Sequence, residues 1–373
     1  MRIGITCYPT YGGSGVVATE LGMFLTKRGH EIHFISSDLP FRLRSFRGKF
    51  FFHEVKVINY PLFEYQQSYA LNLAAKMSEV ITYQELDILH VHYAIPHSIS
   101  AYLARQITKR PFKIITTLHG TDITVVGNEP EFLPVTQFGI NESDGVTAVS
   151  NYLSEQTYKT FGINIDIKVI YNFVNTQEFT RKTNSELRKK YAPDGEKIMI
   201  HISNFRPVKR VDSIIEIFAK ICEDIPSKLL LIGDGPERGK AEKMCRDLDI
   251  CDHTLFLGKQ TDIQDFLSIS DLVICTSKTE SFGLTILEAM SCGVPVLSTR
   301  VGGIPEIVEN EKQGFLLDGL DIDEFALAGK TILSDKKLQD EMSKSGMKRA
   351  RDKFDAKKII PQYEKYYKEV LDR

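Results

Sequence analysis

The sequence lacks tryptophan altogether, and it has neither an excess of charge of one sign nor a long apolar run. Its 47 lysines and arginines nearly balance its 49 aspartates and glutamates, which leaves a formal net charge of −2. Nucleic-acid binders usually carry a basic excess, so this balance argues against that class. No apolar run reaches the roughly 18 residues that a spanning helix requires, so we expect no stable membrane association.

The six cysteines show no tight ligand spacing. Cys275 and Cys292 lie in apolar runs and are expected to be buried thiols. Cys245, Cys251 and His253 have no evident fourth ligand, so we expect no metal site. This cysteine usage fits a reducing cytoplasm. The chain begins directly with an apolar strand pattern, so we expect no signal peptide.

The length of 373 residues exceeds what one hydrophobic core usually supports, so we expect two domains. Short apolar runs alternate with amphipathic segments, which is typical of a parallel sheet covered by helices. The pattern predicts an α/β protein with two doubly wound, Rossmann-like domains facing each other across a cleft. The expected strands, six in each half, are residues 2–7, 31–36, 88–92, 113–118, 145–149 and 168–170, then 197–202, 228–232, 254–257, 272–276, 295–298 and 314–317.

A polar stretch that ends in Pro193-Asp194-Gly195 marks the expected boundary between the domains. Buried tyrosines are expected on one face of the last helix, at Tyr363, Tyr366 and Tyr367. The expected division is an N-terminal domain (1–171), a link (172–195), a second domain (196–350) and a C-terminal helix (351–373) that packs back towards the first domain.

Two glutamates eight positions apart, Glu280 and Glu288, mark the most informative segment. Glu280 falls in the loop after an expected strand, and Glu288 lies about one turn inside the next expected helix. The backbone N–H groups between them are free to bind an anion. This order of hydroxyl-binding, phosphate-binding and hydroxyl-binding groups suits a nucleotide sugar. The intervening amides are those of Phe282, Gly283 and Leu284.

Two cations, Arg206 and Lys209, follow the expected strand 197–202 and stand three residues apart at the start of a helical turn. Arginine offers a planar fork for phosphate oxygens and lysine a compact charge. A departing diphosphate needs such stabilisation, because negative charge builds on it in the transition state. The alternative is a solvated basic turn. Asp212 is expected to cap the following helix.

A glycine-rich loop around Gly13, Ser14 and Gly15 follows the first strand and opens an apolar helix. Glycines let a backbone approach a ligand, and a helix N-terminus favours negative charge. Gly13-x-Gly15-x-x-Ala18 also matches a dinucleotide fingerprint, with Asp38 as a ribose ligand. A purely structural turn would use the same residues, so all three interpretations stay open.

A histidine, His119, ends the expected strand 113–118 in the sequence Thr117-Leu118-His119-Gly120-Thr121-Asp122. At this place it can donate to a sugar hydroxyl. The alternative is that Thr121 or Asp122 caps the next helix and that His119 is incidental. Tyr93 and Asn151 follow two further strands.

These motifs together resemble the retaining GT-B glycosyltransferases of family 4. The resemblance runs over nearly the whole chain and is most specific at Glu280-x7-Glu288 with its flanks Gly293-Val294-Pro295-Val296 and Gly302-Gly303-Ile304-Pro305-Glu306. The segments 8–20, 90–97 and 116–124 resemble the members that make the first intermediate of bacillithiol.

The resemblance implies UDP-GlcNAc as the donor and L-malate as the acceptor, with no cofactor and no metal. It implies Arg206 and Lys209 on the diphosphate, and Glu280 and His119 on the sugar near the reacting carbon. The remaining donor contacts that it implies are Gly13 on the diphosphate, the amides of Phe282, Gly283 and Leu284 on sugar and phosphate, Glu288 on the ribose, and Gly258, Lys259 and Gln260 beside the uracil.

Acceptor contacts are expected from neutral side chains of the first half, namely Ser14, Tyr93, Thr117 and Asn151. Arg44, in the 40–50 loop, would neutralise a malate carboxylate. No residue stands out as a nucleophile, so front-face transfer with retention is expected. The resemblance also implies a homodimer.

Rival functions remain on the sequence alone. Another acceptor, a lipid or a polysaccharide, would use the same donor chemistry, and the residues 41–52 are both basic and rich in phenylalanine. A UDP-GlcNAc epimerase of GT-B fold, a nicotinamide dehydrogenase and a nucleotide-sugar sensor are the alternatives from other classes.

Overall fold

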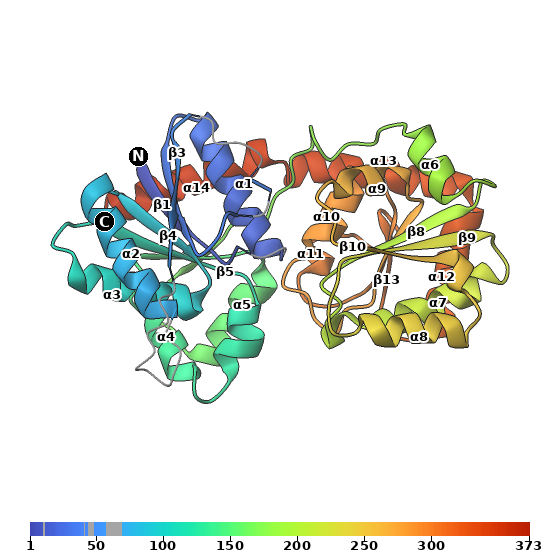
Figure 1. The fold of residues 1–373 in the computed structure, drawn as a ribbon, viewed down its shortest axis with the longest axis horizontal. Helices are drawn as coiled ribbons and strands as arrows, with labels where there is room; N and C mark the ends of the chain where they lie inside the picture. The colour runs from blue at the N-terminus through green and yellow to red at the C-terminus, as the bar shows by residue number, and fades with distance from the viewer. Residues whose placement is uncertain (10–11, 41, 44–47, 57–68) are drawn as a thin grey trace. The chain divides into compact units, whose positions relative to one another are not determined.

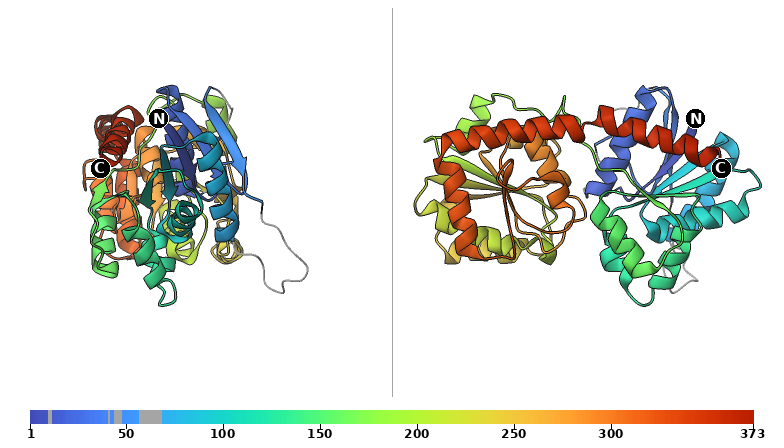
Figure 2. Two further views of the ribbon diagram at one scale, coloured as in Figure 1. Left: turned by 90° about the vertical axis from the view of Figure 1, so that its left-hand side faces the viewer. Right: turned by 180° about the vertical axis from the view of Figure 1, so that it is seen from behind.

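The computed structural model describes residues 1–9, 12–40, 42–43, 48–56 and 69–373. These residues form two compact units. Unit 1 comprises residues 1–172 together with 357–373, and unit 2 comprises residues 173–356. Each unit is a parallel sheet between layers of helices (Figures 1 and 2), which confirms the predicted doubly wound architecture of each.

Seven parallel strands form the sheet of unit 1, in the order β3-β2-β1-β4-β5-β6-β7. The order reverses beside β1, because β2 pairs on one side of it and β4 on the other. Ligands of such sheets bind where the strand order reverses, at the carboxyl ends. The strands are β1 (Arg2–Thr6), β2 (Glu31–Ser36), β3 (Phe50–Glu54), β4 (Ile88–His92), β5 (Lys113–Leu118), β6 (Gly145–Ala148) and β7 (Ile167–Val169).

One strand of unit 1, β3, is absent from the sequence prediction, so the expected six strands were one too few. It is an edge strand that pairs only with β2. The sequence pattern did not reveal β3, because its three consecutive phenylalanines, Phe50–Phe52, differ in burial. Of these, only Phe50 is buried, and Phe51 is exposed. The run therefore shows neither the alternation of a half-buried strand nor the length of a core strand.

Helices cover both faces of the unit 1 sheet. Leu89 and Val91 pack in a core with residues of α2 and α3, whereas His90 between them hydrogen-bonds to Tyr367 of α14 on the other face. Tyr363, Tyr366 and Tyr367 are all buried, as predicted. The helices are α1 (Gly13–Lys27), α2 (Tyr69–Gln84), α3 (Ile99–Ile107), α4 (Leu133–Asn141), α5 (Asn151–Phe161) and α14 (Ala356–Leu371), with short helical turns at Ala94–Ser98, Thr121–Val125 and Val126–Asn128.

Six parallel strands form the sheet of unit 2, in the order β10-β9-β8-β11-β12-β13, which matches the predicted set. The switch in strand order lies beside β8, between β9 and β11. The strands are β8 (Lys197–Ile202), β9 (Ser227–Ile232), β10 (Thr254–Gly258), β11 (Leu272–Cys275), β12 (Val296–Thr299) and β13 (Gly314–Leu317).

One hydrophobic core of unit 2 lies between the sheet and the helices α7, α8 and α12, which share one face of the sheet in Figure 1. It combines aliphatic and phenylalanine side chains, with Ile215 and Phe218 of α7 against Leu229 and Leu231 of β9. The helices are α6 (Ser185–Tyr191), α7 (Val211–Cys222), α8 (Arg238–Asp247), α9 (Ile263–Ile269), α10 (Leu284–Ser291), α11 (Ile304–Ile307), α12 (Ile322–Ser334) and α13 (Lys336–Lys353), with 3-10 turns at Pro207–Lys209 and Cys251–His253.

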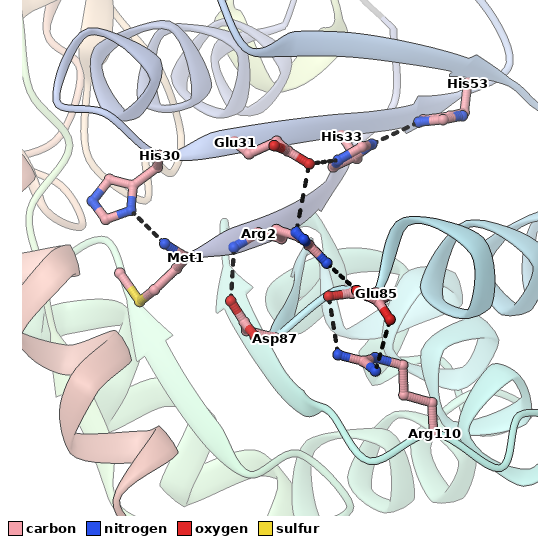
Figure 3. Close-up of polar contacts among 9 residues, drawn as sticks. All are labelled: Met1, Arg2, His30, Glu31, His33, His53, Glu85, Asp87 and Arg110. Carbon is pink, nitrogen blue, oxygen red and sulfur yellow. Dashed lines mark hydrogen bonds and ion pairs between the residues drawn. The ribbon is translucent and has the colours of Figure 1, made fainter.

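A polar network ties the amino ends of the unit 1 strands (Figure 3). The Arg2 guanidinium pairs with Glu85 and lies 3.8 Å from Glu31. Glu31 in turn contacts His33 at 3.1 Å, and His33 contacts His53 at 2.9 Å. Because Arg2 and Glu85 are exposed, water and salt screen their attraction, and the pair adds little to stability. The network begins at the amino ends of β1 and β2 and extends to His53, next to the last residue of β3.

Four histidines are buried near the carboxyl ends of β4 and β5, namely His90, His92, His97 and His119. Burial lowers the pKa of His90 and His119 to about 3 and that of His97 to about 4. Burial also lowers the pKa of His92, and the neighbouring histidines add to the effect. All four are therefore neutral at pH 7.

We expect unit 1 to lose stability as the pH falls from 7 to 5. A histidine with a lowered folded pKa stabilises the fold fully above its unfolded pKa of about 6.5, and this contribution is lost as the pH falls towards the folded value. His90, His97 and His119 would each remove up to about 2 kcal/mol by pH 5. Hydrogen exchange read by mass spectrometry, corrected for intrinsic rates, measures this loss in the peptides of β4 and β5.

Unit 2 serves as the internal reference, because its buried His201 supplies one such group. Burial lowers the pKa of His201 to about 4. Peptides of β8 and β11 should lose less protection than those of β4 and β5. Equal losses in the two units would contradict this assignment of the acid-sensitive groups.

Candidate functional site

An ion pair links two of the predicted site residues at the carboxyl edge of the unit 2 sheet. Lys209, in the turn after β8, binds the Oε1 atom of Glu280, in the loop after β11. Both side chains are only about one-fifth exposed, at 20% and 19%. Burial alone would lower the pKa of Lys209, but the Glu280 carboxylate outweighs burial and raises the pKa above its ordinary value. Lys209 is therefore a cation at physiological pH.

The turn that carries Lys209 has an unusual backbone. Phe205 and Arg210, on either side of the 3-10 turn, have positive φ angles of 39° and 50°. Such left-handed conformations are costly for residues other than glycine and persist where the surroundings impose them. Arg206 precedes the turn with an exposed side chain, which forms no ion pair within the described part of the chain.

The predicted cap of the following helix is wrong. Arg210, not Asp212, is the N-cap residue of α7, and its side chain makes no capping hydrogen bond. Asp212 lies inside the first turn, where its carboxylate accepts from Ser213 N at 2.9 Å and from Lys240 Nζ at 2.5 Å. The sequence led to the wrong cap because the expected start of the helix was two residues too late. A carboxylate in the first turn then has the position of a capping residue.

The segment between the two glutamates takes the predicted form of strand, loop and helix. Glu288 lies in α10 and is 2% exposed. Gly283 caps α10 with a left-handed backbone, at φ 100° and ψ 53°. Phe282 beside it is buried, and its ring lies edge-on to that of Phe354. The predicted amide donors Phe282, Gly283 and Leu284 thus surround the N-terminus of α10.

Two glycines outside the predicted site fix the Glu280 loop by close backbone contact. A Cβ atom at Gly302 would lie 1.8 Å from the Glu280 carbonyl oxygen, and one at Gly303 would lie 2.4 Å from that of Ser281. The N–H of Gly303 donates to the Glu280 carbonyl at 2.9 Å. Only residues without a side chain fit against this loop, so the pair Gly302-Gly303 sets the position of Glu280.

The predicted uracil contacts lie at the carboxyl end of β10. Gly258 has a positive φ of 64° and accepts a hydrogen bond from Gly233 N at 2.8 Å. The Gln260 side chain donates to the Leu257 carbonyl at 2.6 Å. Lys259 lies between them. The three residues therefore stand beside the loop after β9, at the same edge of the sheet as Lys209.

In unit 1 the glycine-rich turn and the end of β4 meet through two hydroxyl groups. Ser14 Oγ lies 2.6 Å from the phenolic oxygen of Tyr93. Gly13 is the first residue of α1, and Gly12 is its N-cap. Tyr93 has a positive φ of 93°, and its N–H donates to the Thr117 carbonyl at 2.9 Å. Gly13, Ser14 and Tyr93 are thereby brought together.

The turn that carries His119 is held by one carboxylate. Asp122 accepts from the N–H groups of His119, Gly120 and Ala94, at 3.2, 2.8 and 2.8 Å. Burial raises the pKa of Asp122, although these backbone donors oppose the rise. The capping alternative is wrong for this residue, because Asp122 binds the turn before it and does not cap the helical turn Thr121–Val125. His119 Nε2 lies 2.8 Å from His92 Nδ1.

The other two predicted acceptor residues differ in exposure. The Thr117 side chain is fully buried, and its hydroxyl contacts His90 Nε2 and Thr147 Oγ1, each at 2.6 Å. Asn151 is exposed at the start of α5, and its amide donates to Tyr171 Oη at 2.8 Å. The structure thus groups Ser14 with Tyr93 and keeps the Thr117 hydroxyl in the interior. Arg44 lies outside the described residues.

Sequence reasoning missed the residues that support the predicted ones, chiefly His92, Thr276 and Ser277. His92 contacts His119, while Thr276 and Ser277 contact the Lys209 turn and Glu280. The sequence held a signal for them, because each follows or ends a buried strand and is polar. The partner of His92 lies 27 positions away in the sequence, and that of Thr276 lies 67 positions away. No local sequence pattern indicates contacts over such separations.

All six cysteines are free thiols, and Cys275 and Cys292 are buried as predicted. A search of the described ranges finds no group of three or more histidine, cysteine, aspartate or glutamate side chains arranged to hold a metal ion. Over the same ranges, every helix is too short or too polar to cross a membrane.

Comparison with protein families gives two adjoining matches. Residues 11–178 match the model described as Glycosyltransferase Family 4, and residues 183–349 match the model described as Glycosyl transferases group 1. N-acetyl-alpha-D-glucosaminyl L-malate synthase of Bacillus anthracis is 48% identical over 372 residues, which is 100% of this chain and 97% of that protein.

Solved structures agree on the fold. Sucrose-phosphate synthase from Thermosynechococcus elongatus matches with a TM-score of 0.84 at 19% identity, over 100% of this chain and 99% of that one. Anabaena HepE in complex with UDP and glucose matches with a TM-score of 0.82 at 23% identity, over 98% and 99%. Two doubly wound units of this kind are the GT-B fold, and the chain is a glycosyltransferase that belongs to family 4.

Proposed function

We propose that this glycosyltransferase moves N-acetylglucosamine from UDP-GlcNAc to the hydroxyl of L-malate, the first step of bacillithiol biosynthesis. The observation that carries the proposal is the 48% identity to the Bacillus anthracis synthase over the full chain. The match covers 100% of this chain and 97% of that protein. The UDP complex of a structural neighbour supports a uridine nucleotide in this fold.

Charge at the carboxyl edge of the unit 2 sheet supports the donor assignment. Arg206 is exposed without an ion-pair partner among the described residues, and Lys209 is charged. We propose that both bind the diphosphate. Glu280 would then bind sugar hydroxyls and the buried Glu288 the ribose. The amides of Phe282, Gly283 and Leu284, the turn at Gly13, and residues Gly258, Lys259 and Gln260 complete the proposed donor contacts.

The proposed acceptor contacts lie in unit 1. Ser14 and Tyr93 already share a hydrogen bond, so one short polar ligand can bind both hydroxyls. Asn151 offers an exposed amide at the start of α5. Thr117 supports them indirectly, because its carbonyl accepts from the N–H of Tyr93. His119 is neutral at pH 7, since burial lowers its pKa to about 3, and it would therefore bind the sugar by hydrogen bonding.

Transfer with retention of configuration is the mechanism that we propose. The bond from the sugar C1 to the β-phosphate oxygen breaks, and a bond from C1 to the malate hydroxyl oxygen forms on the same face. The proton of that hydroxyl passes to the departing phosphate oxygen. Arg206 and Lys209 stabilise the charge that develops on the diphosphate, which is where fixed cations contribute most.

Malate-dependent release of UDP is the first prediction. The protein incubated with UDP-GlcNAc should release UDP with L-malate but not with succinate, which has the same two carboxylates and lacks the hydroxyl. The product should be the α-anomer, read from its proton NMR coupling. Because Arg206 and Lys209 would supply the positive charge, EDTA should leave the rate unchanged.

Other outcomes of the same assay separate the rivals. Release with a lipid or polysaccharide acceptor and none with malate would assign a different acceptor. Conversion of UDP-GlcNAc without an acceptor to its C2 epimer would assign an epimerase. A β-linked product would refute retention.

Removal of either proposed diphosphate cation should slow transfer sharply. We expect Arg206→Ala and Lys209→Ala each to lower kcat by roughly 10²- to 10³-fold, because the charge they stabilise is greatest in the transition state. Lys243→Ala removes an exposed lysine of α8 and serves as the matched control. Near-full transfer by both site variants would remove these residues from the mechanism.

We also propose that the enzyme works as a homodimer in the cytoplasm. Its six free cysteines suit a reducing compartment. The dimer rests on the resemblance to family members. Size-exclusion chromatography with light scattering should give twice the chain mass of 42.3 kDa, and a mass of one chain would reject the dimer.

A further inference from the structure

The residues that follow β11 contact both charged parts of the proposed donor site. Thr276 Oγ1 lies 3.1 Å from the Lys209 carbonyl oxygen and 3.0 Å from that of Arg210. The N–H of Lys278 donates to the Val208 carbonyl at 2.8 Å. Thr276 is fully buried, so water cannot replace its hydroxyl. The turn that carries the cations is therefore bound to the end of β11 at consecutive carbonyl groups.

This turn needs an external partner. It is a single 3-10 turn between two non-glycine residues with positive φ, Phe205 and Arg210. A left-handed backbone is unfavourable at residues other than glycine, so the surrounding structure must offset its cost. The carbonyls of Lys209 and Arg210 have the Thr276 hydroxyl as a shared donor. The position of Lys209 thus depends on the Thr276 side chain together with the backbone hydrogen bond from Lys278 to Val208.

A second hydroxyl contacts the carboxylate of the pair. Ser277 Oγ donates to Glu280 Oε1 at 3.2 Å, and this oxygen also binds Lys209 Nζ. The thiol of Cys275 lies 3.3 Å from Ser277 Oγ. Since the Ser277 proton is directed at Glu280, the thiol is the donor in the contact with Ser277. The chain of donors therefore runs from Cys275 through Ser277 to Glu280.

Donor binding would change the partners of both charges. A diphosphate attracts Lys209 away from Glu280, because it carries more negative charge than one carboxylate. Glu280 is only 19% exposed, and a largely buried carboxylate that loses its partner is destabilised. The Ser277 hydroxyl already contacts the same oxygen and can remain there when Lys209 leaves.

We propose that Thr276 and Ser277 are positioning residues of the transfer reaction. Thr276 holds the cation turn in the place where charge develops on the leaving diphosphate. Ser277 keeps Glu280 oriented towards the donor sugar when Lys209 turns to the diphosphate. The inference rests on the proposed donor site and adds to it two residues that touch no substrate.

The two roles predict different kinetic effects. Thr276→Val keeps the shape and removes the hydroxyl, and it should lower kcat about tenfold with little change in the KM for UDP-GlcNAc. Thr276→Ser restores a hydroxyl and should recover most of kcat. Ser277→Ala should raise the donor KM about five- to tenfold with a smaller change in kcat, because Glu280 binds the ground-state donor.

A matched control separates positioning from general destabilisation. Thr136→Val removes a fully buried threonine hydroxyl of α4, which donates to the Phe132 carbonyl at 2.8 Å. It should lower the thermal unfolding temperature about as much as Thr276→Val does and leave kcat unchanged. If Thr276→Val does not fold, Thr276→Ser and Ser277→Ala still carry the test through their KM and kcat values.

The inference and the proposed function fail in different ways. Wild-type kinetics in Thr276→Val and Ser277→Ala, together with a strong defect in Lys209→Ala, would overturn the positioning roles alone. An equal defect in Thr276→Val and Thr276→Ser would also overturn the role of the Thr276 hydroxyl. Absence of UDP release from the wild-type protein with every acceptor would overturn the donor assignment and the inference with it.

Discussion

Parallel strand pairing is the constraint on which the rest of this protein depends. When all strands of a sheet run in one direction, every loop that follows a strand leaves at the same edge. The turns after β8, β10 and β11 in unit 2, and those after β1, β4 and β5 in unit 1, are neighbours for this reason. Charged groups far apart in the chain, such as Lys209 and Glu280, meet because each follows a strand that ends at this edge.

The opposite charges at that edge of unit 2 also stabilise each other. A lysine and a glutamate that are each about four-fifths buried would be costly if either stood alone. Paired, each satisfies the other, and in the proposed function a diphosphate and sugar hydroxyls would take their places. Under that proposal, donor binding would require an exchange of ion-pair partners and no refolding of the two loops.

The sequence was sufficient to predict most of the fold, whereas the site residues stay predictions. Buried parallel strands such as β8 and β11 are short apolar runs, and Glu280, Arg206 and Lys209 stand out because they follow such runs. Edge strand β3 was missed because it has only one buried residue among three phenylalanines. Thr117 was placed in the acceptor site because strand ends point to ligands, yet its hydroxyl contacts His90 and Thr147. Which face of a strand a side chain occupies at its last residues depends on local twist, and sequence gives little sign of it.

The two parts of unit 1 are far apart in the sequence, and this separation affects the order in which the chain can fold during synthesis. Its sheet is built from the first 172 residues, but the buried Tyr363, Tyr366 and Tyr367 belong to the last 17. A ribosome delivers the whole of unit 2 before it delivers that helix. Until that helix is synthesised, the face of β4 and β6 that receives α14 is uncovered, with His90 lacking its tyrosine partner. Unit 2 can thus complete its core before α14 is synthesised, whereas unit 1 must wait for that helix, and unit 1 is therefore the unit that depends on protection from aggregation.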